Sequence, residues 1–412
     1  MQELYKYLSN FIYDYNFKKL YTTIENKLKS YREKNTNILV SQFQGMGDLI
    51  LTSAFIRELR KNYPDRHITL VCNYPWQDLF ELCPYINKIG INKLKLYNYY
   101  SLISEAANIC KMNNLWERKY DLAINTHWNM IGFLASIVNW VSISNQNIGY
   151  NFDSEHQYFY NHITFDLFID QLRMDKYILT KQIKNPFKMY HEADRKLYIL
   201  EQLGLKVEDR NLELWLSNKD INFAKNVLNT NKKKIVIGLA SSDAMKNYPI
   251  DKLLIVLFTL IKDNNEIILL GGEEDINKAN YLIEHQIPCI NLVNKTTIRE
   301  TAAVISQSDL YIGNDTGLMH MATVFDKPII MYSREAKNFS LRPGSRSSIA
   351  RFHPYYGSKE NKAIILQPEH RLGKCHFVEI YGGCCAEEEH CITQITPDEI
   401  IQAYLQIKGK YL

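Results

Sequence analysis

Short apolar runs alternate with segments of helical periodicity along most of the chain, and this alternation begins twice. Each apolar run has the length of a buried strand, and residues 48–62 and 190–205 carry the 3.6-residue spacing of helices. Strands that alternate with helices predict parallel sheets with helices on both faces. The predicted strands are 38–41, 67–72 and 121–125 in the first half, and 234–239, 266–270, 289–292, 310–313 and 328–332 in the second half.

The sheet pattern fades between residues 150 and 210, and this gap separates two domains of similar internal logic. We predict one α/β domain over 36–205 and a second over 206–412. Ligands of such sheets bind beyond the carboxyl ends of the strands, and two facing sheets form a cleft between them. The loops that follow the predicted strands are therefore the places to search for chemistry.

Residues 1–35 precede the first strand and predict an N-terminal helical extension. Leu4, Leu8, Phe11 and Tyr15 recur at helical spacing among polar residues. Such a segment packs on the body of the protein or on another subunit. The alternative is a peripheral contact with an anionic membrane surface, because lysine and arginine outnumber the acids in this segment.

Composition narrows the class of protein without identifying it. Of the 412 residues, 46% are hydrophobic and 23% are charged, which is typical of a globular protein. The net charge of +4 is too small to indicate a nucleic-acid partner. The chain lacks an apolar run of the roughly 18 residues that a membrane span requires, and it opens without a signal-peptide pattern. We therefore expect a cytoplasmic protein.

The stretch QGMGDLILT, residues 44–52, reads as a tight glycine turn that leads from the first strand into a helix. Asp48 stands where the turn becomes the helix. A carboxylate at this point stabilises a helix N-terminus through the helix dipole. It is also placed at a strand end, where a catalytic group would face a ligand. The stretch alone leaves both interpretations of Asp48 open.

The stretch DLYIGNDTGLMHMA, residues 309–322, is a candidate phosphate site. A strand is followed by a polar turn and by a helix that begins near Gly317, so free first-turn N–H groups point outward. Thr316 is placed to cap the helix or to bind a phosphate oxygen, and His320 lies one turn further on. The alternative is an ordinary capped helix with a histidine that faces the core.

Two further loops follow strands in the second half. Residues 240–249 contain Lys246, which would supply a positive charge to a phosphate. Residues 270–275, LGGEED, combine glycines with acids such as Glu273 that bind sugar or ribose hydroxyls. An ordinary solvated surface lysine is the alternative for Lys246.

Taken in order, these motifs resemble glycosyltransferase family 9, the ADP-heptose:lipopolysaccharide heptosyltransferases. The resemblance rests on ILVSQFQGMGDLILTSAFIREL, the Lys-x-Tyr-Pro loop, LLGGEED and IGNDTGLMHMATVFDKPIIMY, and it covers roughly residues 36–335. It implies a GT-B fold, with two Rossmann-like domains that face each other across a cleft. It also implies an ADP-sugar donor held mainly by the second domain, and metal-independent transfer with inversion at the anomeric carbon.

The resemblance also implies roles for individual residues. Asp48 is the expected general base, which takes the proton of the attacking hydroxyl. No cofactor is expected to be required for catalysis. The implied donor-binding residues are Lys246, Glu273, Asp315, Thr316, Gly317 and His320, and the implied acceptor-side residues are Gly45, Gly47 and His127.

A cysteine cluster lies in the tail segment 375–391, at Cys375, Cys384, Cys385 and Cys391. Four thiolates suit a structural zinc or an iron ion. Adjacent cysteines ligate one metal poorly and the spacing lacks a CxxC pair, so reduced thiols without a metal are an equal alternative.

We therefore expect an inverting glycosyltransferase that moves a heptose-like sugar from ADP-heptose to lipopolysaccharide core or a related surface glycan. Such an enzyme would work at the cytoplasmic face of the inner membrane, with no nucleic-acid partner. One alternative is a nucleotide-sugar epimerase of GT-B shape, which needs no acceptor. Another is a non-catalytic protein that binds nucleotide sugars.

Overall fold

The structure is a computed structural model of the chain. It describes residues 37–93, 102–127, 131–142, 144–150, 178–184, 186, 191–239, 246–337, 348–372 and 390–412. The predicted helical extension over residues 1–35 lies outside this part of the chain.

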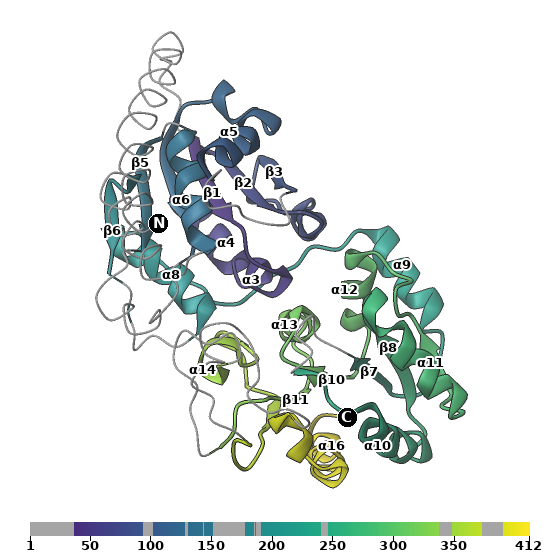
Figure 1. The fold of residues 1–412 in the computed structure, drawn as a ribbon. Helices are drawn as coiled ribbons and strands as arrows, with labels where there is room; N and C mark the ends of the chain where they lie inside the picture. Colours follow the sequence, from purple (N-terminus) through teal and green to yellow (C-terminus); the bar gives the residue numbers. More distant parts are fainter. Residues whose placement is uncertain are drawn as a thin grey trace, which may run out of the picture.

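The first domain is built on a parallel sheet of six strands in the order β3-β2-β1-β4-β5-β6 (Figure 1). In its central strand, Val40 pairs with Leu70 on one side and with Ile124 on the other. All three side chains are fully buried, as expected for a sheet covered on both faces. The strands are β1 (Asn37–Gln42), β2 (His67–Asn73), β3 (Lys88–Asn92), β4 (Tyr120–Asn125), β5 (Ser144–Tyr150) and β6 (Lys181–Ile183).

The second domain repeats this topology. Its parallel sheet has the order β12-β11-β10-β7-β8-β9, which is the same order as in the first sheet when it is read from β9. Each sheet therefore has one point at which the strand order reverses, between β1 and β4 and between β7 and β10. The strands are β7 (Lys234–Gly238), β8 (Glu266–Leu270), β9 (Cys289–Asn291), β10 (Leu310–Asn314), β11 (Ile329–Tyr332) and β12 (Ala363–Leu366).

Helices connect these strands, and capping boxes begin three of them, α9, α12 and α16. In the first domain the helices are α3 (Met46–Ile50), α4 (Ser53–Asn62), η3 (Trp76–Phe80), α5 (Leu102–Met112), η5 (Leu115–Glu117), α6 (Ile131–Val141) and α8 (Glu192–Gln202). In the second domain they are α9 (Asn218–Val227), α10 (Ile250–Lys262), η8 (Glu273–Asp275), α11 (Ile276–Glu284), α12 (Ile298–Ser306), α13 (Gly317–Val324), α14 (Ile349–Phe352), η9 (Cys391–Gln394) and α16 (Pro397–Tyr411).

The prediction of one helix over 48–62 is wrong, because the structure divides it into α3 and α4. The backbone carbonyl of Asp48 accepts a hydrogen bond from the Thr52 hydroxyl at 2.8 Å and another from the Gln42 side-chain amide at 2.9 Å. The Thr52 N–H bonds instead to the carbonyl of Leu49, three residues back. Side-chain competition for a helical carbonyl thus shortens α3 to little more than a turn.

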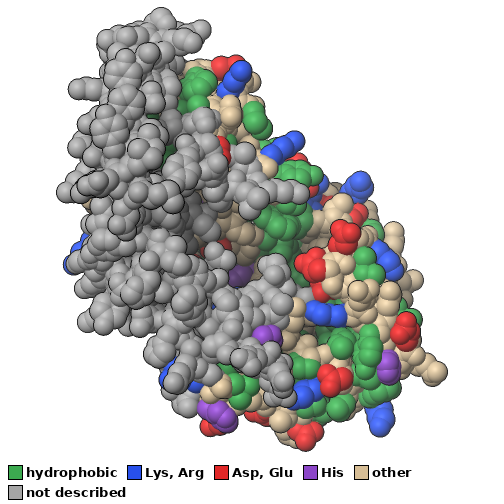
Figure 2. All heavy atoms as spheres, viewed as in Figure 1, with side chains coloured by type: hydrophobic (Ala, Val, Ile, Leu, Met, Phe, Trp, Pro, Cys, Tyr) green, Lys and Arg blue, Asp and Glu red, His purple; other side chains and the backbone are tan. Residues whose placement is uncertain are grey.

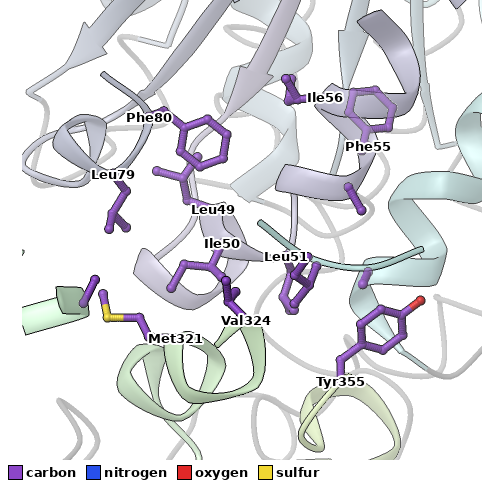
Figure 3. Close-up of a cluster of buried hydrophobic side chains, with 14 of the residues drawn as sticks. Leu49, Ile50, Leu51, Phe55, Ile56, Leu79, Phe80, Met321, Val324 and Tyr355 are labelled. Atoms are coloured by element: carbon purple, nitrogen blue, oxygen red, sulfur yellow. The ribbon is translucent and has the colours of Figure 1, made fainter. Parts of the chain in front are cut away.

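An apolar contact joins the two domains beside α3. Leu49 and Ile50 belong to the same buried cluster as Met321 and Val324 of α13. Figure 3 shows Ile50 directed toward Met321 and Val324, with Leu49 on the side of Phe80. The short helix that carries Asp48 is therefore held against the second domain by its own apolar side chains.

The segment that follows β11 returns to the first domain, where α14 lies close to α8 (Figure 1). The Nε2 atom of His191, the N-cap residue of α8, lies 3.0 Å from the carbonyl oxygen of His353. The ring of His191 also stacks on Tyr355 at 4.4 Å. Further along, the side-chain amide of Asn211 bonds to Ser358 at 3.0 Å. Residues 348–358 thus fix the position of α8 relative to the second domain.

On the face shown in Figure 2, acidic and basic side chains are interspersed. Among the helices that the structure describes, none is long and apolar enough to cross a membrane.

Candidate active site

Asp48 lies in the first turn of α3, directly beyond the carboxyl end of β1. The N-cap residue of this helix is Gly45, and no side chain caps the helix. The Oδ1 atom of Asp48 is buried and makes no hydrogen bond within the described part of the chain. Asp48 therefore makes no capping hydrogen bond, although as an acid in the first turn of α3 it still lies where the helix dipole favours a negative charge.

The environment of Asp48 opposes its ionisation. Burial raises the pKa of this carboxyl to about 6, and the charges of Glu192 and Asp315 add to the rise. The cations of Lys196 and Arg351 act in the opposite direction. A carboxyl group with a pKa near 6 is still ionised at neutral pH and is a much stronger base than an ordinary aspartate.

His127 follows β4, the strand beside β1, and its side chain is buried. Its Nε2 atom accepts a hydrogen bond from the backbone N–H of Phe43 at 2.9 Å. Burial lowers the pKa of His127 well below its usual range, so the ring is neutral and Nδ1 carries the proton. Nδ1 makes no hydrogen bond to the described residues. His127 can therefore donate to a ligand, and this tautomer does not provide a base at Nδ1.

On the second domain, Lys246 follows β7 and Asp315 follows β10, the two strands that flank the reversal of strand order. The Nζ atom of Lys246 lies 2.7 Å from Oδ2 of Asp315. Both side chains remain slightly exposed, at 13% and 12%. The lysine predicted to meet a phosphate is thus held by a neighbouring aspartate at the place where ligands of such sheets bind.

Helix α13 begins at Gly317, and Thr316 is its N-cap residue. The Thr316 hydroxyl does not cap the helix; it lies 3.5 Å from the hydroxyl of Tyr311. The first backbone N–H groups of α13 therefore receive no bond from this side chain. Such a helix start, beside a lysine, suits a phosphate group.

The α3 turn and the start of α13 meet directly. A Cβ atom added at Gly47 would lie 2.8 Å from Cδ2 of His320, and one added at Gly317 would meet the end of the Met46 side chain. His320 is buried, which lowers its pKa to about 4 and keeps it neutral. Gly47 was expected on the acceptor side, and its contact is with the second domain. Gly45 is exposed, with open space where its Cβ would be.

Glu273, the remaining predicted donor residue, is exposed at the start of η8, beyond β8. Its neighbour Asp275 has a structural role, because its carboxylate accepts the N–H of Gly272 at 3.1 Å. The structure thus leaves the Glu273 side chain open to solvent at the same edge of the sheet as Lys246.

Three of the predicted metal ligands, Cys375, Cys384 and Cys385, lie outside the described residues. Cys391 is at the start of η9, where its sulfur accepts the N–H of Leu372 at 3.4 Å. Within the described ranges, His, Cys, Asp and Glu side chains form no group of three or more that could hold a metal.

Residues 112–360 match the sequence profile of Glycosyltransferase family 9 (heptosyltransferase), which is more than half of the chain. The chain belongs to glycosyltransferase family 9. It is thus a family 9 heptosyltransferase with a GT-B fold, and the resemblance inferred from the sequence motifs is confirmed.

Its relatives are distant. The chain is 22% identical to the lipopolysaccharide core heptosyltransferase OpsX of Haemophilus influenzae over 304 residues, which is 73% of this chain and 79% of OpsX. It is also 22% identical to lipopolysaccharide heptosyltransferase 1 of Campylobacter coli over 390 residues, covering 90% of this chain and 99% of the relative.

Solved structures agree on the fold. A family 9 glycosyl transferase from Veillonella parvula superposes with a TM-score of 0.70 at 22% identity, over 91% of this chain and 98% of the other. The Escherichia coli heptosyltransferase WaaC with ADP superposes with a TM-score of 0.62 at 13% identity, over 90% of this chain and all of the other.

Two residues near these groups were missed by the sequence reasoning. Asn314 ends β10, and neither polar atom of its buried amide has a partner among the described residues. Lys196 lies on α8 with its side chain fully buried. Little in the sequence signals Lys196, because it stands among the other charged residues of EADRKLYILEQ and only the packing of α8 buries it.

Proposed function

We propose that this heptosyltransferase transfers a heptose from ADP-heptose to a hydroxyl of a lipopolysaccharide-core or related glycan acceptor, with Asp48 as the general base. The observation that carries the proposal is the geometry around Asp48. A carboxyl of raised pKa, whose buried Oδ1 atom makes no hydrogen bond to described residues, lies on a short helix that touches the start of α13 through Gly47 and His320. A proton acceptor is thereby brought next to a phosphate-type site on the other domain.

The donor would occupy the second domain. We place its diphosphate against the first turn of α13 and Lys246, with Thr316 as a hydroxyl donor. Negative charge grows on the diphosphate as the bond to the anomeric carbon breaks, and these groups stabilise that charge. Glu273, exposed beyond β8, is available to the hydroxyls of the nucleoside or sugar.

The acceptor hydroxyl would approach from the first domain. Asp48 takes its proton as its oxygen bonds to the anomeric carbon on the face opposite the diphosphate, so the configuration inverts. A direct displacement of this kind needs no enzyme nucleophile. The proposed mechanism uses protein groups alone. His127, with Nδ1 as a donor, is placed to orient the acceptor.

The relatives named as heptosyltransferases of lipopolysaccharide core support this acceptor class. Synthesis of that core would place the enzyme at the cytoplasmic face of the inner membrane. We propose that residues 36–205 form the acceptor-binding domain and residues 206–412 the donor-binding domain. Residues 348–358 of the donor-binding domain pack on the first domain.

The test is transfer with purified enzyme, ADP-heptose and truncated core acceptors, with products identified by mass spectrometry. A heptosylated product and free ADP are expected, and thermal protection by ADP should exceed that by UDP or GDP. Conversion of the donor without any acceptor would indicate an epimerase. Binding of ADP-heptose with no turnover on any acceptor would contradict the proposed transfer.

A further inference from the structure

Lys196 is a buried cation to which the proposed mechanism gives no task. Its side chain is fully inaccessible to solvent, and its Nζ atom makes no hydrogen bond to any residue that the structure describes. Burying an ammonium group without a partner is costly, and an apolar side chain at such a position usually gives a more stable protein. A buried ammonium that is retained near a reactive carboxyl, despite its cost in stability, indicates a role in function.

The other charges on α8 are already matched. Glu192 is buried and lies 2.7 Å from the guanidinium of Arg351 and 3.5 Å from that of Arg195. Although burial acts to raise the pKa of Glu192, these two arginines and Lys196 outweigh it and lower the pKa to about 2. Glu192 is therefore a stable carboxylate that is held by two arginines.

The second carboxylate near Lys196 is Asp48. Lys196 is the strongest of the charges that favour the ionised form of Asp48, and Asp48 is the strongest of those that keep Lys196 protonated. The Oδ1 atom of Asp48 and the Nζ atom of Lys196 are both buried without a hydrogen bond to described residues. A fully buried ammonium on α8 and a half-buried carboxyl on α3 thus act on each other, without a direct ion pair between them among the described residues.

We propose that Lys196 is a positioning residue for the general base: its buried ammonium holds Asp48 in the carboxylate form at neutral pH. The proposal rests on the proposed function, because it assigns Asp48 as the base. Burial lowers the pKa of Lys196, whereas the charges of Asp48 and Glu192 oppose that fall, and the proposal requires Lys196 to remain protonated. Asp48 gains a proton from the acceptor hydroxyl, the hydroxyl oxygen bonds to the anomeric carbon, and the diphosphate leaves with the electron pair of the broken bond.

Other ionisable groups lie near Asp48 and Lys196 on the helices and loops that pack around them. Because burial alone would leave Asp48 protonated at a higher pH, the balance of these charges decides its state. They are Glu192 and Arg195 on α8, His191 at its N-cap, His127 after β4, Arg351 on α14, and Asp315 and His320 at the start of α13.

The test is the pH dependence of kcat/KM for heptosyl transfer by the wild type and by Lys196→Met, which keeps the length of the side chain. In the wild type, activity should fall below about pH 6, where Asp48 becomes protonated. In Lys196→Met this acid limb should move up by about one pH unit, since a nearby opposite charge shifts a carboxyl by that amount or more. The rate at high pH should be retained.

Two variants serve as controls. Lys206→Met removes an exposed cation just after α8 and should leave the acid limb in place. Lys196→Arg keeps the charge and should restore the limb toward the wild-type position. If Lys196→Met fails to fold, Lys196→Gln enters the same comparison.

An acid limb that does not move would overturn the proposal, as would an equal loss of rate at every pH, which a merely structural role predicts. A double-mutant cycle with Asp48→Asn, measured by chemical denaturation, tests the pairing without any enzyme assay. Zero coupling there also overturns it. Full activity of Asp48→Asn would instead reject the base assignment in the proposed function, so the two failures are distinguishable.

Discussion

The two domains share one topology and carry opposite chemistry. Both sheets have six parallel strands in the same order, and in both the candidate residues follow the two strands where that order reverses. At the first reversal stands a carboxyl of raised pKa, Asp48. At the second stand a lysine and a free helix start, Lys246 and α13. The fold determines where a ligand binds, and the side chains at that place determine whether the site transfers a proton or binds a phosphate.

The two sites also differ in how their charges are partnered. Lys246 and Asp315 form a direct ion pair at 2.7 Å, so their charges balance each other until a ligand competes for the lysine. The Oδ1 atom of Asp48 and the Nζ atom of Lys196 are both buried without hydrogen bonds to described residues. In the first domain, the two opposite charges are desolvated without a direct hydrogen bond, which is unfavourable. In the second domain, the lysine and the aspartate already bond to each other before any ligand binds.

The largest effect is expected from Asp48→Asn, which removes the proton acceptor and keeps the shape of the side chain. Turnover should fall by roughly 10²–10⁴-fold, while the Kd for ADP is unchanged because the donor groups lie on the other domain. The measurement is kcat beside calorimetric titration with ADP, and Asp65→Asn is the control at an exposed site. Turnover within a factor of a few of the wild type would show that the base is another group.

Lys246→Met should weaken the binding of ADP without affecting the general base. Its removal leaves Asp315 facing the diphosphate without the cation that neutralises it, so the Kd for ADP should rise roughly 10- to 100-fold. Lys262→Met, an exposed lysine at the end of α10, is the matched control. An unchanged Kd for ADP in Lys246→Met would move the phosphate site away from the start of α13.

Much of this comparison could be predicted from the sequence. The central strands of both sheets are continuous apolar runs, and the glycine turn and the NDTG stretch mark their ligand-facing ends. Strands β3, β5, β6 and β12 were missed, because they lie toward the sheet edges, where burial is less complete and the apolar signal is broken by polar residues such as those of SNQNIGY.

Contacts between residues that are far apart in the sequence could not be predicted. The contact of Gly47 with His320 joins residues far apart in the sequence, and it depends on how two complete domains pack. The role of Lys196 depends likewise on α8 lying against α4 and beside Asp48. The division of the predicted helix at Leu51 and Thr52 required the Gln42 side chain from the preceding strand. Local patterns find sites one strand end at a time, and tertiary packing then pairs them.

Asp48→Asn should also stabilise the first domain at neutral pH. Because the folded pKa of about 6 lies above the ordinary value of 3.8, the native state favours the protonated carboxyl, and stability is lost as the pH rises through the folded value. At pH 7 the variant should therefore unfold with a free energy higher by about 1–3 kcal/mol. Urea denaturation at pH 4 and pH 7 measures this, and the gain should shrink at pH 4. A destabilised variant at pH 7 would indicate that the favourable interactions of the carboxylate, including the one with Lys196, outweigh the cost of its burial.

Gly47→Ala should disturb the contact between the domains. Its Cβ would lie 2.8 Å from the ring of the buried His320, so the domains or the ring must shift, at a cost of about 1–3 kcal/mol. We expect kcat/KM to fall roughly tenfold, in line with that cost. Gly45→Ala, with open space at its Cβ, is the control, and Gly317→Ala meets the flexible end of Met46 and should cost less. Equal activity of the Gly47 and Gly45 variants would contradict the close approach.

The smallest effect is expected at the rim of the interface, where Arg299 of α12 joins the domains. Its guanidinium pairs with Glu81 of the first domain and lies 3.4 Å from Asp220 of the second. It also donates to the backbone carbonyl of Asp78 at 3.2 Å. Exposed ion pairs contribute about 0.2–1 kcal/mol and weaken in salt. Arg299→Gln should therefore lower kcat/KM by less than about fivefold.

This loss should disappear in 0.5–1 M NaCl, roughly the range where charges at the protein surface are screened. Lys337→Gln is the matched control, because its pair with Glu369 lies within the second domain and should not affect closure. A salt-independent loss as large as that of Gly47→Ala would mean that Arg299 acts through packing. In that case the polar rim, and not the apolar contact of α3 with α13, would hold the base of one domain against the phosphate site of the other.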